Sequence, residues 1–166
     1  DVSDETRAMV EATMSRIGYR PSALARSLVQ QRSQTLGFVT TSLGFHGILE
    51  ALNGVVDAAE RADYGLLVKG VHEPAQRELH DVIDFFIEHR VEGIVVLVPG
   101  LDVPRFLGER PLAAQTPPTV FVKSYPDPRY FNVAVDNVGG GLVATEHLLG
   151  LGRRHIAHLS GPTWWS

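Results

Sequence analysis

The sequence predicts an α/β protein in which helices cover both faces of a parallel sheet, preceded by a smaller helical segment. From Leu36 onward, short apolar runs alternate with amphipathic helical stretches. Residues 2–18 form a separate helical pattern with its own start and stop signals. Charge divides the chain in the same way. Five arginines and one acidic residue lie between Arg7 and Arg32, whereas residues 33–166 hold ten basic and fifteen acidic residues. A basic arm on an acidic body indicates that the arm binds a polyanion; the alternative is a solvated helix face.

The first helix is predicted over residues 2–18. Ser3 is its N-cap, and Gly18 has the place of a left-handed residue after the last turn, with Pro21 just beyond it. The apolar residues recur at helical spacing, as Val10, Met14 and Ile17. One amphipathic helix has nothing of its own to pack against. We therefore expect its partners to precede it, in a small helical domain inside which the chain begins.

Residues 22–29 are predicted to form a second, shorter helix. Pro21 and Ser22 form a start signal, and the residues after them are good or tolerable helix formers. About eight residues is below the ~12–15 at which an isolated helix becomes marginal in water. Residues 30–34 form a polar linker without periodicity. A plain interdomain linker over the whole of residues 22–34 is the alternative.

The larger segment is predicted to contain six strands, at residues 36–41, 64–69, 93–98, 119–123, 133–136 and 155–160. The helix after the first strand has one apolar face, formed by Ile48, Leu52, Val55, Val56, Ala59 and Ala62. The next begins with Pro74 as its first residue and carries an apolar stripe of Leu79, Val82, Ile83, Phe86 and Ile87. Residues 102–108 and 138–151 are the remaining predicted helices. Buried strands between helices indicate a parallel sheet, which binds ligands at the carboxyl ends of its strands.

Composition excludes several classes of protein. The chain has no cysteine, which excludes disulfides and thiolate metal sites, and no apolar run approaches the ~20 residues of a membrane span. A cytosolic protein is the simplest interpretation, although a mature exported protein would also lack a leader. The seven histidines show no metal-binding spacing, and Ser160 lacks the sequence of a nucleophile elbow. We therefore expect no metal, no cofactor and no catalysis.

The glycine cluster at Gly139 matches a dinucleotide fingerprint, G-x-G-x-x-G/A, between a predicted strand and a predicted helix. A dinucleotide site also requires an acidic residue about 20 positions further on, and no acid follows Glu146. The fingerprint usually follows the first strand of a fold, whereas here it follows the fifth. We therefore interpret the glycines as allowing a helix N-terminus to approach the sheet closely.

Four segments resemble conserved stretches of the LacI/GalR family of bacterial transcriptional regulators. Residues 18–28 (GYRPSALARSL) resemble the GYxPNxxARSL segment between headpiece and core, and residues 90–96 resemble the strand entry RVDGIIL. Residues 149–162 resemble LxxLGHRRIAFISGP, and Asp136-Asn137 followed by glycines resembles VxxDNxxGG. The four matches occur in the family's order and spacing and cover nearly the whole chain.

The resemblance implies a domain organisation. Residues 1–21 would be the end of a helix-turn-helix DNA-binding domain, and residues 22–34 a hinge helix and linker. Residues 35–162 would be the amino-terminal lobe of a periplasmic-binding-protein-like core, and residues 163–166 the start of a second lobe. Leu28 would be the side chain that wedges into the minor groove, and the DNA contacts of this segment would come from Tyr19, Ser22, Ala25, Arg26 and Leu28.

The implied effector site lies at the strand ends. The family often reads N-P-F-F after its first strand, with aromatics that stack on the effector, whereas this chain has Phe45-His46-Gly47-Ile48. Phe45 and His46 are the candidates for that role, and an ordinary surface or core position is the alternative for each. Asp136 and Ser160 complete the predicted site because they lie at or just after predicted strand ends.

The resulting hypothesis is a cytoplasmic, dimeric regulator that binds operator DNA and senses a small sugar-like or nucleoside-like effector. The alternative is a solute-binding protein with the same core and no DNA role, which gives no reason for the arginine-bearing GYRPSALARSL arm. A nucleotide-dependent enzyme is a third possibility, and it lacks the acid that its fingerprint requires.

Overall fold

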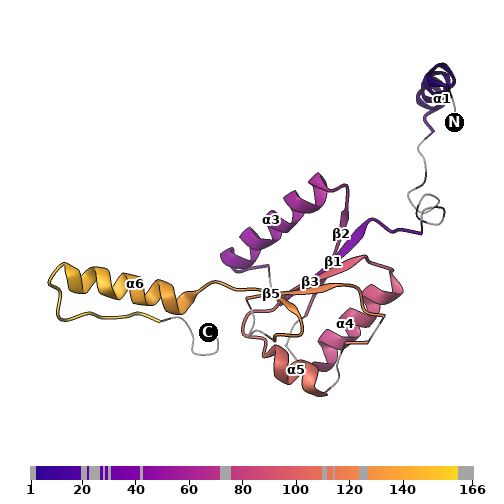
Figure 1. Cartoon of the computed structure of the whole chain (residues 1–166). Coiled ribbons are helices and arrows are strands. Elements are labelled where there is room, and N and C mark those ends of the chain that lie inside the picture. The colour runs from indigo at the N-terminus through magenta and orange to yellow at the C-terminus, as the bar shows by residue number, and fades with distance from the viewer. Residues whose placement is uncertain are drawn as a thin grey trace. The chain divides into compact units, whose positions relative to one another are not determined.

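The computed structural model describes residues 3–19, 22, 27, 29, 31–41, 43–71, 76–109, 112–113, 115–123 and 127–160. The chain divides into two compact units, Asp1–Ser33 and Gln34–Ser166. Figure 1 shows the elements and their labels.

In the first unit, helix α1 spans Asp4–Ile17 and has the predicted ends. The Ser3 side chain accepts a hydrogen bond from the Thr6 backbone N–H, so the predicted N-cap is confirmed. Gly18 has φ of 66° and donates its N–H to carbonyls of the last turn, as the left-handed position requires. No residue of α1 is buried. The predicted hinge helix at residues 22–29 lies outside the described residues except for Ser22, Ser27 and Val29.

The second unit is built on a five-stranded, fully parallel sheet in the order β2-β1-β3-β4-β5. The strands are β1 (Thr35–Thr40), β2 (Gly65–Gly70), β3 (Gly93–Leu97), β4 (Thr119–Val122) and β5 (Phe131–Val133). The helices are α3 (His46–Arg61), α4 (Gln76–Glu88), α5 (Val103–Glu109) and α6 (Asn137–Gly150). The predicted alternation of strands and helices around a parallel sheet is thus confirmed, and the sheet order reverses at β1, where β2 and β3 lie on opposite sides of it.

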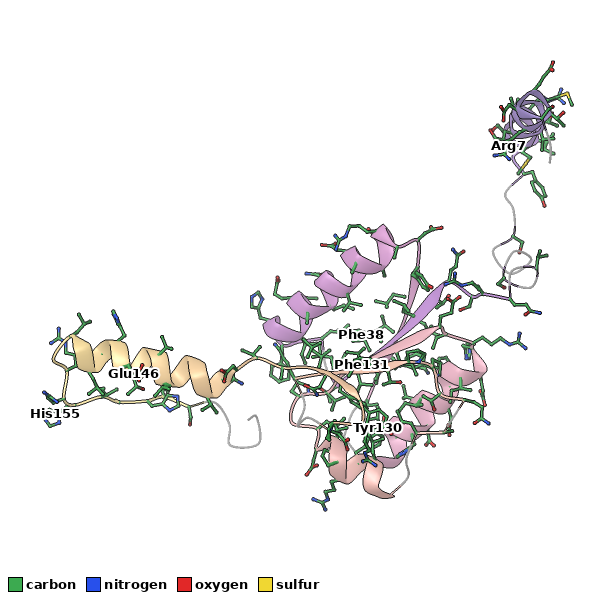
Figure 2. The ribbon with its side chains drawn as sticks, in the orientation of Figure 1. Arg7, Phe38, Tyr130, Phe131, Glu146 and His155 are labelled. Carbon is green, nitrogen blue, oxygen red and sulfur yellow. The ribbon has the colours of Figure 1, made fainter. Side chains whose placement is uncertain are left out.

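Two apolar clusters show that helices cover both faces of this sheet. Helix α3 packs on one face, where Ile48 joins Phe38 of β1 and Leu97 of β3. Helices α4 and α5 pack on the other face, where Phe86 and Phe106 join strand residues such as Val96. Figure 1 shows α3 on one side of the sheet and α4 with α5 on the other. In Figure 2 the Phe38 side chain lies within the layer between α3 and the sheet, consistent with its complete burial.

The predicted helix faces agree with this packing. In α4, Leu79, Val82, Ile83 and Phe86 are all buried. In α3, Ile48 and Ala59 are buried, and Leu52 and Val55 pack against the cluster beneath them. Ala62 differs from the prediction, because it is the exposed cap after the helix. Pro74, predicted to begin α4, lies outside the described residues.

Two strand predictions were wrong. Residues 155–160 form no strand and are exposed, with Leu159 at 98%. Apolar residues alone do not make a strand, because its backbone N–H and C=O groups must pair with a neighbour, and the described sheet ends at β5. The fifth strand is Phe131–Val133 rather than residues 133–136. It ends early because the Asn137 N–H turns back to the Val135 carbonyl and Asp136 caps α6.

Candidate functional site

A cavity of about 270 Å³ lies at the carboxyl edge of the sheet, where a parallel sheet is expected to bind ligands. Its described lining residues follow β1, β3, β4 and β5 along the chain: Gly47, Ile48, Pro99, Lys123, Ala134, Val135 and Asn137. The first two belong to α3 and the last begins α6. The volume is near the lower end of the ~300–1,000 Å³ typical of ligand pockets, so it suits a small molecule.

Helix α3 presents its first turn to this cavity without a side-chain cap. Phe45 is the N-cap residue and makes no capping hydrogen bond, and the first turn contains no acidic residue. Among the described residues, no group accepts a hydrogen bond from the backbone N–H of His46 or Gly47. These two N–H groups are therefore available to an acceptor. The amino end of a helix also carries partial positive charge.

Lys123 follows β4 and lies opposite that helix end. Its backbone has φ of 55°, a left-handed conformation that is uncommon for a residue other than glycine. The Lys123 N–H donates to the Val133 carbonyl at 2.9 Å, which ties the end of β4 to β5. The Lys123 ammonium Nζ donates to the Gly47 carbonyl at 3.4 Å. The side chain therefore reaches from β4 to the first turn of α3.

None of the four predicted effector contacts belongs to the described lining of the cavity, and three of them lie close to lining residues in the chain. Phe45 and His46 directly precede Gly47, and Asp136 lies between the lining residues Val135 and Asn137. The Asp136 carboxylate accepts from the Gly139 N–H at 2.8 Å and so caps α6. Ser160 is exposed in the segment after α6. The structure brings the first three to one edge of the sheet and does not bring Ser160 into the lining.

Sequence reasoning missed Pro99 and Lys123, although a signal for both was present. Pro99 closely follows β3, and Lys123 immediately follows β4. The rule that selected Phe45 and Asp136, a position just beyond a predicted strand, applies equally to these two residues. Nothing in the local sequence shows which strand ends are adjacent, since that depends on the strand order.

The glycine cluster has a local explanation. A Cβ at Gly139 would collide with the Asp136 carboxylate, so glycine is required there for the cap to form. A Cβ at Gly140 or Gly141 would meet nothing within 4 Å. Close approach to the sheet, which the sequence suggested, is therefore wrong for the described residues: the contact that needs a glycine is the cap.

Of the predicted DNA-contacting residues, Tyr19 and Ser22 are described and both are exposed. Ala25, Arg26 and Leu28 lie outside the described residues. Among the helices that the structure describes, none is long and apolar enough to cross a membrane.

Comparison with known proteins gives sequence relatives over nearly the whole chain, whereas no family model matches it. The chain is 26% identical to the lactose operon repressor of Escherichia coli (strain K12) over 161 residues, 97% of this chain and 44% of that protein. It is 30% identical to the ribose operon repressor of the same strain, covering 97% of this chain and 48% of that protein. It is also 30% identical to the HTH-type transcriptional repressor PurR of Vibrio cholerae serotype O1 (strain M66-2), covering 96% and 47% respectively. The chain thus spans about half the length of the curated relatives it matches.

Solved structures show the same fold. The Lac repressor bound to ONPG in the repressed state matches with a TM-score of 0.84 at 24% identity, over 99% of this chain and 49% of that one. The Lac repressor dimer bound to operator and the anti-inducer ONPF matches with a TM-score of 0.83 at 24% identity, over the same shares of the two chains. The five-stranded parallel sheet therefore corresponds to a periplasmic-binding-protein-like lobe. The chain is thus similar, in sequence along nearly its whole length and in fold, to repressors of the LacI/GalR family, whose motifs residues 18–28, 90–96 and 136–162 resemble.

Proposed function

We propose that the whole protein is a cytoplasmic, dimeric transcriptional repressor that binds operator DNA and responds to a small effector, without catalysis. The single observation that carries this proposal is the similarity to repressors along 96–97% of the chain, which includes the basic arm as well as the sheet. A solute-binding protein would need the sheet and its cavity but not the arm. The repressors named for lactose and ribose operons support a sugar-like effector, and PurR leaves a nucleoside-like one as the alternative.

The DNA-binding role rests on the arm. Its five arginines would neutralise phosphates and release counterions, so affinity for DNA would fall steeply as salt rises. The segment at residues 22–29 is too short to be a stable helix alone, so it would fold when two copies meet on DNA. Leu28 from each copy would then insert between base steps and kink the duplex, with contacts from Tyr19, Ser22, Ala25 and Arg26.

In the test, the whole protein first selects DNA from a random pool. The affinities of Leu28→Ala and of the control Val29→Ala for this DNA are then compared with that of the wild type at one salt concentration. We expect Leu28→Ala to weaken specific binding about tenfold or more and non-specific binding much less, because only the specific complex contains the kink. Val29, whose side chain is 87% exposed, tests whether loss of any apolar side chain in this segment has the same effect. Equal affinities for the two variants would contradict the hinge assignment. Ligand binding without any selected DNA would favour the solute-binding alternative.

The effector role of Asp136 needs a substitution that separates ligand contact from capping. Asn is as good an N-cap as Asp, so Asp136→Asn keeps the bond to the Gly139 N–H while removing the negative charge. Asp136→Ala removes both. If the carboxylate accepts hydrogen bonds from effector hydroxyl groups, both variants will lose effector affinity in calorimetry. Normal affinity in Asp136→Asn would confine this side chain to capping α6.

A further inference from the structure

The described lining of the cavity carries a positive charge and no negative charge. Of its seven described lining residues, Lys123 is the one with an ionisable side chain. No acidic side chain pairs with Lys123 among the described residues, and its polar contact there is the Gly47 carbonyl at 3.4 Å. Asp136, the nearest acid along the chain to the lining, is engaged with the Gly139 N–H instead. Lys123 is exposed, and the cavity presents its ammonium group without an acidic partner among the residues that the structure describes.

The place of this cation is unfavourable for the helix it faces. Cations stabilise the carboxyl end of a helix and anions the amino end. Helices α5 and α6 follow that rule, since the carboxylates of Asp102 and Asp136 accept from first-turn N–H groups, and α1 carries acidic residues in its first turn. Helix α3 instead has a lysine ammonium at its first turn and N–H groups at His46 and Gly47 that no described group accepts. An anion in the cavity would satisfy both the ammonium and the helix end.

Thr40 adds a polar group on the same side of the sheet. It ends β1 two residues after Phe38, so strand alternation places its side chain on the face that α3 covers, toward the carboxyl edge. The Thr40 side chain is 1% exposed, and its hydroxyl has no hydrogen-bond partner among the described residues. Buried hydroxyl groups normally have one. Thr40 is not among the described residues that line the cavity, but it adds an unused donor on the same face and at the same edge of the sheet.

From these contacts we infer that the effector carries an anionic group, a carboxylate or a phosphate, which binds between the Lys123 ammonium and the first turn of α3. This inference rests on the proposed function, because it assigns the chemistry of the effector that the regulator senses. Lys123 would determine specificity, since a neutral sugar leaves the ammonium without a counter-charge. The two lysines of the chain provide a matched control, because Lys69 lies over the Phe85 ring on the α4 side of the sheet, 4.2 Å from the ring centre.

The experiment uses the whole protein as wild type and as Lys123→Met, Lys123→Arg and Lys69→Met. The probes are glucose, gluconate, glucose 6-phosphate and inorganic phosphate, with affinities from calorimetry. A second measurement follows the side-chain NMR signals of ¹³C-methylated Lys123 and Lys69 during each titration, assigned from the methionine variants. We expect an anionic probe to shift the Lys123 signal and not the Lys69 signal. We also expect Lys123→Met to weaken binding of that probe at least tenfold, because a charge-assisted hydrogen bond is lost, while Lys123→Arg and Lys69→Met stay within about threefold of wild type.

Each outcome has one meaning. Preference for gluconate assigns a carboxylate to the effector, and preference for glucose 6-phosphate or inorganic phosphate assigns a phosphate. Absence of any Lys123-specific shift with all three anions overturns the inference, as does equal affinity in wild type and Lys123→Met. Binding to selected DNA is measured in parallel with and without each probe. Absence of DNA binding by the wild type under all of these conditions would refute the proposed function, whereas normal DNA binding with no Lys123 response would refute only the anionic effector.

Discussion

Arg129 holds the Asp127 carboxylate with both ends of its guanidinium group: Nε donates to Oδ1 at 2.9 Å and Nη2 to Oδ2 at 2.7 Å. The Arg129 backbone N–H also donates to Oδ1, and the Tyr130 N–H donates to the Asp127 carbonyl. This loop joins β4 to β5 and sets the Tyr130 ring edge-on to Phe121 of the core, with ring centres 5.8 Å apart. Figure 2 labels Tyr130 beside α4 and α5, and its side chain packs against the core cluster on that side of the sheet.

The pair predicts a dependence of stability on pH. Hydrogen bonds from the Arg129 side chain and backbone lower the pKa of Asp127 from 3.8 to about 2. A carboxyl group with a lowered folded-state pKa stabilises the fold above its unfolded pKa, and that contribution is lost as the pH falls from about 4 to about 2. Asp127→Asn should flatten the decline in unfolding free energy over this range, measured by urea titration at several pH values. Asp57→Asn, at an exposed site on α3, is the control, and an unchanged profile in Asp127→Asn would contradict the assignment.

Gly37 of β1 is predicted to be essential for packing. A Cβ at this position would lie 2.8 Å from the Phe86 ring, and Phe86 is completely buried between α4 and the sheet. Gly37→Ala should lower the unfolding free energy by about 1–3 kcal/mol, because the ring has no room to retreat. Gly54→Ala is the matched control. It is exposed within α3 with nothing within 4 Å of the new methyl group, so it should raise stability by about 1 kcal/mol. Chemical denaturation of both variants tests the contrast, and equal stabilities would contradict it.

Glu92, in the segment that resembles the family's strand entry, joins three elements at the amino edge of the sheet. Its carboxylate accepts from the Tyr64 hydroxyl at 2.7 Å and from the Gln34 N–H at 2.9 Å. Its own N–H donates to the Thr35 carbonyl. Glu92→Ala should destabilise the sheet by about 1.5–3 kcal/mol, since hydrogen bonds to a charged group are lost at a partly buried site. Tyr64→Phe should have a smaller effect that disappears in the Glu92→Ala background. Additive losses in that double-mutant cycle would show that the two side chains do not interact.

Gly139 is predicted to be required for the start of α6. Gly139→Ala forces the Asp136 carboxylate away from the helix end and removes a cap that contributes about 0.5–2 kcal/mol. Gly140→Ala meets open space and should gain about 1 kcal/mol of helix propensity. Amide hydrogen exchange in the first turn of α6 is the direct measurement. The residue 139 N–H should exchange faster in Gly139→Ala and not in Gly140→Ala; the same rate in both would mean that the cap does not hold this turn.

Features that depend on neighbours along the chain could be predicted from the sequence alone. Ser3 and Gly18 define the ends of α1 through their own side chain and backbone. The stripe of Leu79, Val82, Ile83 and Phe86 fixes which side of α4 is buried, because helical periodicity is local. The alternation of apolar runs and helices was sufficient to predict a parallel sheet and the edge of that sheet at which ligands bind.

Which strand ends meet depends on the order of the strands in the folded sheet. The strand order places Lys123 after β4 opposite Gly47 after β1, although the two residues are 76 positions apart in the sequence. The same strand order leaves residues 155–160 without a strand partner. Capping and periodicity act over one or two helical turns, whereas pairing and cavity formation depend on distant residues that no local pattern specifies. For this reason the sequence predicted the edge of the sheet where the cavity lies, but not the lysine that gives the cavity its charge.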